Sequence, residues 1–178
     1  VYLLPCIAGH VGADAAGVVL AEAPQKAEIN TLVVDVGTNA EIVVGNSKRM
    51  LAASSPTGPA FEGAQISSGQ RAAPGAIERI RIDKDTLEPC FRVIGVEQWS
   101  NEDGFDEAVK STGITGICGS GIIEVLAEMY LSGILSTDGV IDGTVAARTP
   151  RIEEDGRTFA YRVAENVVVT QNDVRAIQ

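Results

Sequence analysis

The sequence predicts an α/β protein, and three observations support this. Apolar residues make up 45% of the 178 residues but aromatic residues only 4%, so Val, Ile, Leu and Ala must form the core. The chain has 19 glycines, which suit tight turns between strands that are buried on both faces. Short β-branched runs are followed by one long helical pattern, which predicts strands packed with helices.

The N-terminal part is predicted to contain a helix and a three-stranded meander. Residues 11–21 are small and apolar, as in a tightly packed helix. Residues 31–36 (TLVVDV) form a continuous β-branched run, which is typical of a central strand. Further strands are expected at residues 40–44 and 49–53, and glycine-containing turns separate them.

The C-terminal part is predicted to contain a hairpin, a strong helix and two short strands. The strongest helical pattern covers residues 119–135, with Ile122, Leu126 and Met129 in one apolar stripe. Ile123, Val125 and Tyr130 widen this stripe, so the helix is expected to be largely buried. Residues 153–155 are consecutive acids and are interpreted as a charged turn. The strands are expected at residues 76–82, 91–96, 158–163 and 166–169.

The two ends indicate a fragment. The chain starts at Val1 inside an apolar run, and residues 170–178 resemble a helix that has just begun. Thr170 would be the N-cap of this helix, with Asp173 in its first turn. We therefore expect residues 1–178 to be part of a longer polypeptide, and we see no domain boundary inside them.

Charge and cysteine content exclude several kinds of site. The net charge of −10 repels nucleic acid and anionic lipid, so neither is an expected partner. A nucleotide is compatible with this charge, because backbone N–H groups and a metal ion can hold phosphates. Three separated cysteines without a CxxC motif support neither a zinc site nor an iron–sulfur cluster in this chain. A reducing cytoplasm is the expected location, and the sequence has no signal peptide or transmembrane run.

The segment Asp35–Asn39 has the composition of a phosphate loop. It lies where a buried strand is expected to enter a tight turn. Gly37 would let the backbone come close to a ligand, and Thr38 and Asn39 offer N–H groups, a hydroxyl and an amide. Asp35 could hold Mg²⁺ directly or through water. Alone, the segment is equally compatible with an Asp that caps a β-turn.

The segment Gly116–Gly121 precedes the strong helix. Gly116, Gly119, Ser120 and Gly121 would form an anion or nucleotide site at the helix N-terminus. The order G-x-x-G-x-G differs from the dinucleotide fingerprint, and no strand of Rossmann type clearly leads into it. The alternative is that Ser120 caps the helix and the glycines permit close packing.

Residues 54–75 form an unusually long segment of small residues, Gly and Pro. Glu62 is its only acid and Arg71 its only base. A long loop in a compact domain is more often functional than idle, although a rigid surface loop is the alternative. His10 is the sole histidine, so neither a His-based triad nor a His-rich metal site can be assembled.

Three strings in this order resemble the C-terminal domain of reductive activators of corrinoid enzymes. They are TLVVDVGTNAEIVVGN, ASSPTGPAFEGAQISSGQRAAPGAIE and TGICGSGII. The resemblance implies a ribonuclease-H-like half of an ATPase domain, related to actin, sugar kinases and heat-shock chaperones, with a mixed sheet and flanking helices. It also implies that Asp35–Asn39 is the phosphate loop of the second half and that Gly116–Gly121 lies near the nucleotide.

The resemblance further implies what the full-length protein does. It would carry an N-terminal [2Fe-2S] domain outside this chain and reduce Co(II) corrinoid to Co(I) on a corrinoid protein, with ATP hydrolysis driving the transfer. Asp35 would serve the Mg²⁺, Gly37–Asn39 the phosphates, and Glu62 would orient water or contact the partner. The fragment alone is expected to lack ATPase activity, and a homodimer is left open. Two alternatives remain: a small-molecule kinase of the same superfamily, and a nucleotide-independent docking module for a corrinoid protein.

Overall fold

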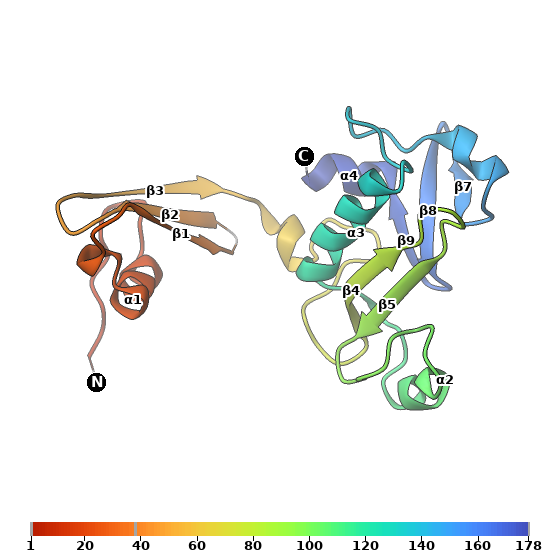
Figure 1. Ribbon diagram of the computed structural model, residues 1–178, viewed down its shortest axis with the longest axis horizontal. Helices are drawn as coiled ribbons and strands as arrows, with labels where there is room; N and C mark the ends of the chain where they lie inside the picture. The colour runs from red at the N-terminus through yellow and green to blue at the C-terminus, as the bar shows by residue number, and fades with distance from the viewer. Residues whose placement is uncertain (1, 38, 178) are drawn as a thin grey trace. The chain divides into compact units, whose positions relative to one another are not determined.

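The chain forms two compact units, Val1–Gly58 and Pro59–Gln178 (Figure 1). The computed structural model describes residues 2–37 and 39–177, apart from the side chain of Phe61. The break between the units lies within the Gly- and Pro-rich segment 54–75, where the sequence had indicated a loop but no boundary. No helix in the described part of the chain is long and apolar enough to cross a membrane.

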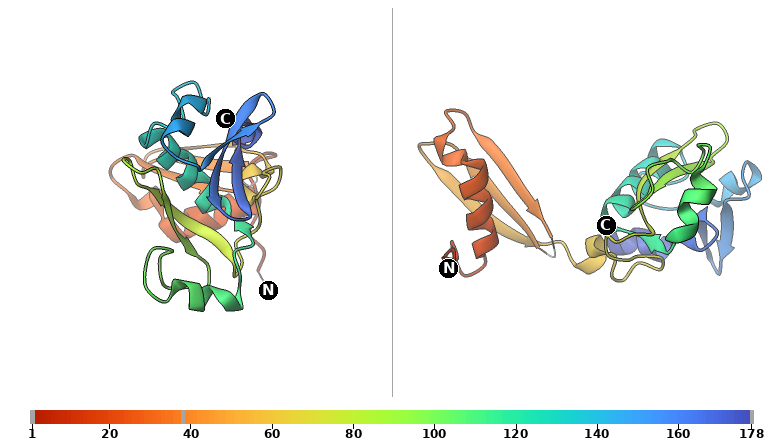
Figure 2. Two further views of the ribbon diagram at one scale, coloured as in Figure 1. Left: turned by 90° about the vertical axis from the view of Figure 1, so that its right-hand side faces the viewer. Right: turned by 90° about the horizontal axis from the view of Figure 1, so that it is seen from below.

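The first unit confirms the predicted helix and meander. Its sheet has the order β1-β2-β3, with β2 antiparallel to both neighbours. The helix contacts β2, and Figure 2 shows it beside the sheet. The elements are α1 (Ala13–Glu22), the short 3₁₀-helix η1 (Pro24–Lys26), β1 (Thr31–Val36), β2 (Asn39–Gly45) and β3 (Met50–Pro56).

One face of this meander is apolar and exposed. Pairing places Leu32 opposite Val44 and Val44 opposite Leu51, so these side chains share a face. Leu32 is 63% exposed and Leu51 55% exposed, whereas Val43, on the other face, is buried. We call Leu32, Val34, Val36, Val44 and Leu51 the exposed sheet face.

The second unit contains two small sheets and two main helices. In the first sheet β4 pairs antiparallel with β5 and parallel with β6, so the predicted mixed sheet is confirmed. The second sheet, β7-β8-β9, is antiparallel. The elements are η2 (Pro59–Glu62), β4 (Ala76–Ile82), β5 (Pro89–Val93), α2 (Phe105–Ala108), η3 (Val109–Ser111), β6 (Gly116–Ile117), α3 (Gly119–Leu131), η4 (Gly143–Ala147), β7 (Ile152–Asp155), β8 (Thr158–Ala164), β9 (Val167–Thr170) and α4 (Gln171–Ile177).

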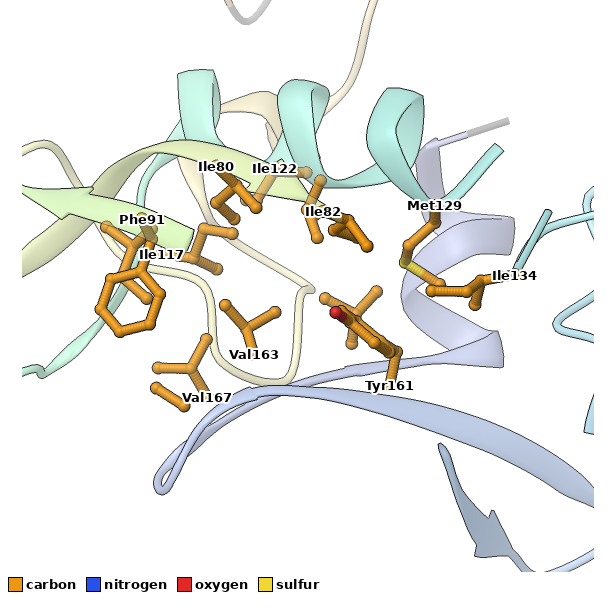
Figure 3. Packing of buried hydrophobic residues seen from close by; sticks show 14 of the residues in the cluster. Ile80, Ile82, Phe91, Ile117, Ile122, Met129, Ile134, Tyr161, Val163 and Val167 are labelled. Carbon is orange, nitrogen blue, oxygen red and sulfur yellow. The ribbon is translucent and has the colours of Figure 1, made fainter. Parts of the chain in front are cut away.

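One hydrophobic core holds the second unit together. Side chains of β4 and α3, such as Ile80 and Met129, meet side chains of β8, such as Tyr161 and Val163 (Figure 3). The Tyr161 hydroxyl donates a 2.8 Å hydrogen bond to the Leu87 carbonyl, which satisfies its one buried polar atom. Burial raises the pKa of Tyr161, so this hydroxyl stays protonated.

Helix α3 buries only one of its faces. Ile122, Val125 and Met129 are buried, but Ile123 is 49% exposed and Tyr130 51% exposed. The prediction of a largely buried helix is therefore wrong, because β4 packs against one side of α3 only. The helix ends at Leu131, before the end of the predicted pattern at residue 135, and Gly133 follows its C-cap residue Ser132 with a φ of +78°.

Two glutamates of α3 accept hydrogen bonds from backbone amides at the unpaired edge of β4. Beyond Ile77, β4 has no strand partner on the side of β6 in the described part of the chain. The Ile80 amide donates instead to Glu124 at 2.7 Å, and the Ile82 amide donates to Glu128 at 3.0 Å. These carboxylates replace the acceptors of a missing strand, so the edge amides stay paired.

Two arginines of β4 surround the first of these carboxylates. Arg79 lies 2.8 Å and Arg81 3.0 Å from Glu124. Burial raises the pKa of Glu124, but the hydrogen bond from the Ile80 amide and the bonds from both arginines outweigh it, so the pKa is lowered. Glu124 is therefore held as a carboxylate.

The C-terminal elements give one correction and one confirmation. Glu153 lies in strand β7 and pairs with Arg162 of β8, so the predicted charged turn is wrong. Cross-strand charge pairing lets acidic residues occupy this strand. Helix α4 begins as predicted: the Asp173 amide donates to the Thr170 hydroxyl at 3.2 Å, and the Thr170 amide donates to Asp173 at 2.8 Å.

Candidate functional site

The predicted phosphate loop is the turn between β1 and β2. Asp35 lies near the end of β1 and is half-buried, whereas Asn39 begins β2 and is exposed. The Gly37 amide donates to the Asn39 carbonyl at 2.9 Å, and the Thr57 hydroxyl donates to the Gly37 carbonyl at 2.5 Å. The turn is therefore tied to the end of β3. Thr38 lies outside the described residues.

Among the described residues, no close contact requires a glycine at position 37. A Cβ atom at this position would meet the Asn39 carbonyl oxygen at 3.6 Å, which is ordinary contact. Gly45, by contrast, has a φ of +151° and would clash with the backbone of Arg49 at 2.1 Å. The turn at Gly45 needs a glycine for the backbone itself, whereas a Cβ at position 37 would make only an ordinary contact.

A small pocket opens beside this loop. Its volume is about 180 Å³, and we call it the phosphate-loop pocket; its lining residues are Asp14, Asp35, Gly37, Asn39 and Glu41. Among the described residues, no group of three His, Cys, Asp or Glu side chains is placed to hold a metal ion. A cation beside Asp35 would therefore need further oxygen ligands. This fits Mg²⁺, which binds through one or two carboxylates, waters and substrate phosphates.

The glycine segment of the second unit starts with a short strand. Gly116 and Ile117 form the two-residue strand β6, parallel to β4, directly before α3. Two residues are too few to give a recognisable apolar run. Gly116 and Gly121 are both buried, and close packing requires a glycine at each position. A Cβ at Gly116 would lie 2.7 Å from the Ser68 carbonyl oxygen, and a Cβ at Gly121 would lie 2.5 Å from the Ile77 carbonyl oxygen.

The N-terminus of α3 borders a second pocket, of about 360 Å³. We call it the helix pocket, and its lining residues are Glu62, Arg71, Ala72, Cys118, Gly119 and Ser120. Among the described residues, no side-chain hydrogen bond caps this helix at its N-cap residue Cys118, and the Ser120 hydroxyl lies 3.2 Å from the Cys118 sulfur. The interpretation of Ser120 as a capping residue is therefore wrong. A helix start of this kind suits an anion, because its first N–H groups are unsatisfied within the helix.

The structure thus places the predicted residues in two pockets, one in each unit. Asp35, Gly37 and Asn39 share the phosphate-loop pocket, and Glu62, Gly119 and Ser120 share the helix pocket. Gly116 and Gly121 line neither pocket.

Sequence reasoning missed two acidic residues of the phosphate-loop pocket, Asp14 and Glu41. The hairpin register sets Glu41 opposite Asp35, so the predicted meander contained a signal for Glu41. Asp14 belongs to α1, and no local pattern connects it with the loop.

Comparison with known proteins gives the family. The family described as the C-terminal domain of RACo, the ASKHA domain, matches residues 29–178. The corrinoid activation enzyme RamQ of Eubacterium limosum is 31% identical over 100% of this chain and 29% of its own length. A [Co(II) methylated amine-specific corrinoid protein] reductase of Methanosarcina barkeri is 29% identical over 96% of this chain and 34% of its own length.

A solved structure supports the same assignment. The reductive activator for corrinoid, iron–sulfur protein matches with a TM-score of 0.81 and 32% identity, over 98% of this chain and 26% of that chain. The chain therefore spans only a quarter to a third of the relatives that it matches. The predicted fold class is confirmed by the structural match and by the mixed sheet. The chain belongs to the family of the C-terminal domain of RACo, the ASKHA domain.

Proposed function

We propose that this chain supplies part of the ATP site of an activator that reduces Co(II) corrinoid to Co(I) on a corrinoid protein. The names of two relatives, a corrinoid activation enzyme and a corrinoid protein reductase, support corrinoid activation. The observation that carries the ATP site is the phosphate loop. Its Gly37 has no steric reason to be glycine, and it lies beside the half-buried Asp35.

In this proposal the β1–β2 turn binds the phosphates. The open backbone at Gly37 lets a phosphate approach closely, and the exposed Asn39 offers an amide donor. Thr38 adds a hydroxyl to the same loop. Asp35 orients the Mg²⁺ that accompanies ATP. Bound Mg²⁺ would neutralise charge on the phosphates during hydrolysis.

The helix pocket of the second unit is proposed to be a nucleotide-binding segment in its own right. Gly119 and Ser120 supply N–H groups at the start of α3, and the exposed Arg71 supplies a cation in the same pocket. Gly116 and Gly121 act through the backbone, since they let α3 and β6 lie close to their neighbours. Glu62 borders the pocket and is proposed to orient water or to contact the partner.

ATP would act by changing how the full-length protein holds its partner. Electron transfer to Co(II) corrinoid is proposed to be uphill, so nucleotide binding and hydrolysis must be coupled to the partner interface. The [2Fe-2S] cluster is proposed to lie in an N-terminal domain outside this chain. The proposed location is the cytoplasm, and the 178-residue chain alone is proposed to be inactive as an ATPase.

The test is ATP hydrolysis by the full-length protein, with and without a Co(II) corrinoid protein. We expect the corrinoid protein to change turnover, and Asp35→Asn to lower it by on the order of 100-fold, as for loss of a group that stabilises transition-state charge. Asp103→Asn, at an exposed position in the second unit, is the matched control and should leave turnover unchanged.

Three results would contradict the proposal. Turnover that ignores the corrinoid protein would exclude the activator role. Phosphoryl transfer from ATP to a small molecule would indicate a kinase. If the full-length protein does not bind ATP, the remaining alternative is a nucleotide-independent docking module for a corrinoid protein.

A further inference from the structure

A buried carboxylate beside the phosphate loop has no role in the proposal above. Glu41 lies in β2, opposite Asp35, and is only 8% exposed. Its hydrogen-bond partner is the Ser54 hydroxyl, 3.1 Å from its carboxylate. Within the described residues, no Lys, Arg or His forms an ion pair with it. Glu124 of the second unit, by contrast, has two arginines beside it.

A carboxylate in this position is costly without a cation. Burying an ionised group is unfavourable unless an opposite charge compensates it, and one neutral hydroxyl supplies little of that compensation. A hydrophobic residue or Gln would fit a β-strand at this depth without the cost. A positive charge bound at this place would explain the residue type.

The surroundings of Glu41 indicate where that charge would lie. Directly opposite residues of an antiparallel pair point to the same face of the sheet, so Glu41 and Asp35 share a face. Both line the phosphate-loop pocket, and Glu41 also borders an adjoining pocket of about 460 Å³ together with Asn39 and Ser54. The open space next to Glu41 is thus the space next to Asp35.

We propose that Glu41 is the second carboxylate for the divalent cation that accompanies the nucleotide phosphates. This inference rests on the proposed ATP site. No set of three ligating side chains is assembled among the described residues, so the cation would depend on phosphate oxygens and water for its other ligands. Tight cation binding should therefore require nucleotide, with Glu41 acting directly or through one water.

The test uses Mn²⁺ in place of Mg²⁺ with full-length protein, read by electron paramagnetic resonance. We expect wild-type protein to bind Mn²⁺ tightly only when ATP is present. Glu41→Gln, which keeps the shape of the side chain, should weaken Mn²⁺ binding in the ATP complex about 10-fold or more, as for loss of a metal-site residue. ATP affinity measured in EDTA should change little.

Two controls separate cation binding from a structural role. Glu28→Gln, at an exposed position of the same unit, should leave Mn²⁺ binding unchanged. Ser54→Ala removes the hydroxyl partner of Glu41 and should retain most of the Mn²⁺ affinity. Equal losses in Ser54→Ala and Glu41→Gln would overturn the inference, because they would show that the hydrogen bond alone matters.

The inference can fail while the proposed function stands. Suppose that wild type binds ATP and Mn²⁺ and that Asp35→Asn weakens Mn²⁺ binding. If Glu41→Gln then behaves like Glu28→Gln, only the role of Glu41 is refuted. If the wild-type protein does not bind nucleotide at all, the proposed function fails first. If Glu41→Gln does not fold, Glu41→Asp can replace it, because this change shortens the side chain by one methylene. Mn²⁺ binding by Glu41→Asp equal to that of wild type would also overturn the inference.

Discussion

The two units differ in how far they bury their large apolar side chains. The second unit gathers them into one core, in which Ile80, Ile117 and Tyr161 have no exposed surface. The first unit buries few large apolar side chains and leaves the exposed sheet face, with Leu32 at 63% and Val36 at 57%. A contiguous apolar surface of this kind usually marks a contact with another part of a protein or with a partner. The first unit, which contains the proposed phosphate loop, therefore leaves more of its large apolar side chains exposed than the second unit does.

The largest difference between the units should appear on truncating core side chains. Ile80→Ala in the second unit should lower the free energy of unfolding by about 2–5 kcal/mol, because it removes a fully buried side chain from β4. Leu32→Ala in β1 is the matched change on the exposed sheet face and should cost less than about 0.5 kcal/mol. Denaturant unfolding measures both. Equal costs would show that Leu32 is covered in the protein and would break the comparison.

A smaller difference should separate the glycines of the two predicted nucleotide segments. Gly121→Ala sets a Cβ 2.5 Å from the Ile77 carbonyl oxygen, so it should destabilise the protein by about 1–3 kcal/mol. Gly37→Ala meets only an ordinary contact, and should lower ATP affinity with little loss of stability. Thermal unfolding and calorimetric ATP titration test the pair. A loss of stability in Gly37→Ala and a loss of ATP affinity alone in Gly121→Ala would contradict the roles assigned to the two glycines.

The smallest effect concerns acid stability. The lowered pKa of Glu124 means that its contribution is fully present above the ordinary glutamate pKa of about 4.3 and is lost as pH falls through the lower folded value. Wild type should exceed Glu124→Gln in stability at pH 7 by less than about 1 kcal/mol, since the pair is partly exposed. The difference should shrink below pH of about 4. Urea unfolding at several pH values measures it, and a difference that grows in acid would contradict the assignment.

Local sequence patterns predicted the helices and strands that are marked by an apolar run or stripe with glycine at its boundary. Strand β1 was predicted to the residue, because a β-branched run is bounded by a glycine turn. The start of α3 followed from its glycines, but its exposed side, with Ile123 and Tyr130, depends on which neighbour covers the helix. Strand β7 was missed because its acidic residues are paired only across the sheet, with Arg162.

Sequence patterns could indicate only the loops of the candidate site. The loop at Asp35 and Gly37 follows from residue types next to a strand end. The burial of Glu41 does not, because it depends on contacts made by the folded unit. The packing roles of Gly116 and Gly121 depend on the backbones of Ser68 and Ile77, which are far away in the sequence. Contacts of this kind have no local signal.

The two carboxylate bonds from α3 to β4 also constrain motion. An α-helix rises about 1.5 Å per residue, so sliding α3 by one residue along its axis would break the bonds of both Glu124 and Glu128. The amides of Ile80 and Ile82 would then lose their acceptors at a cost of about 1–3 kcal/mol each. The two bonds thereby oppose sliding of α3, which carries Gly119 and Ser120 at its start, along β4.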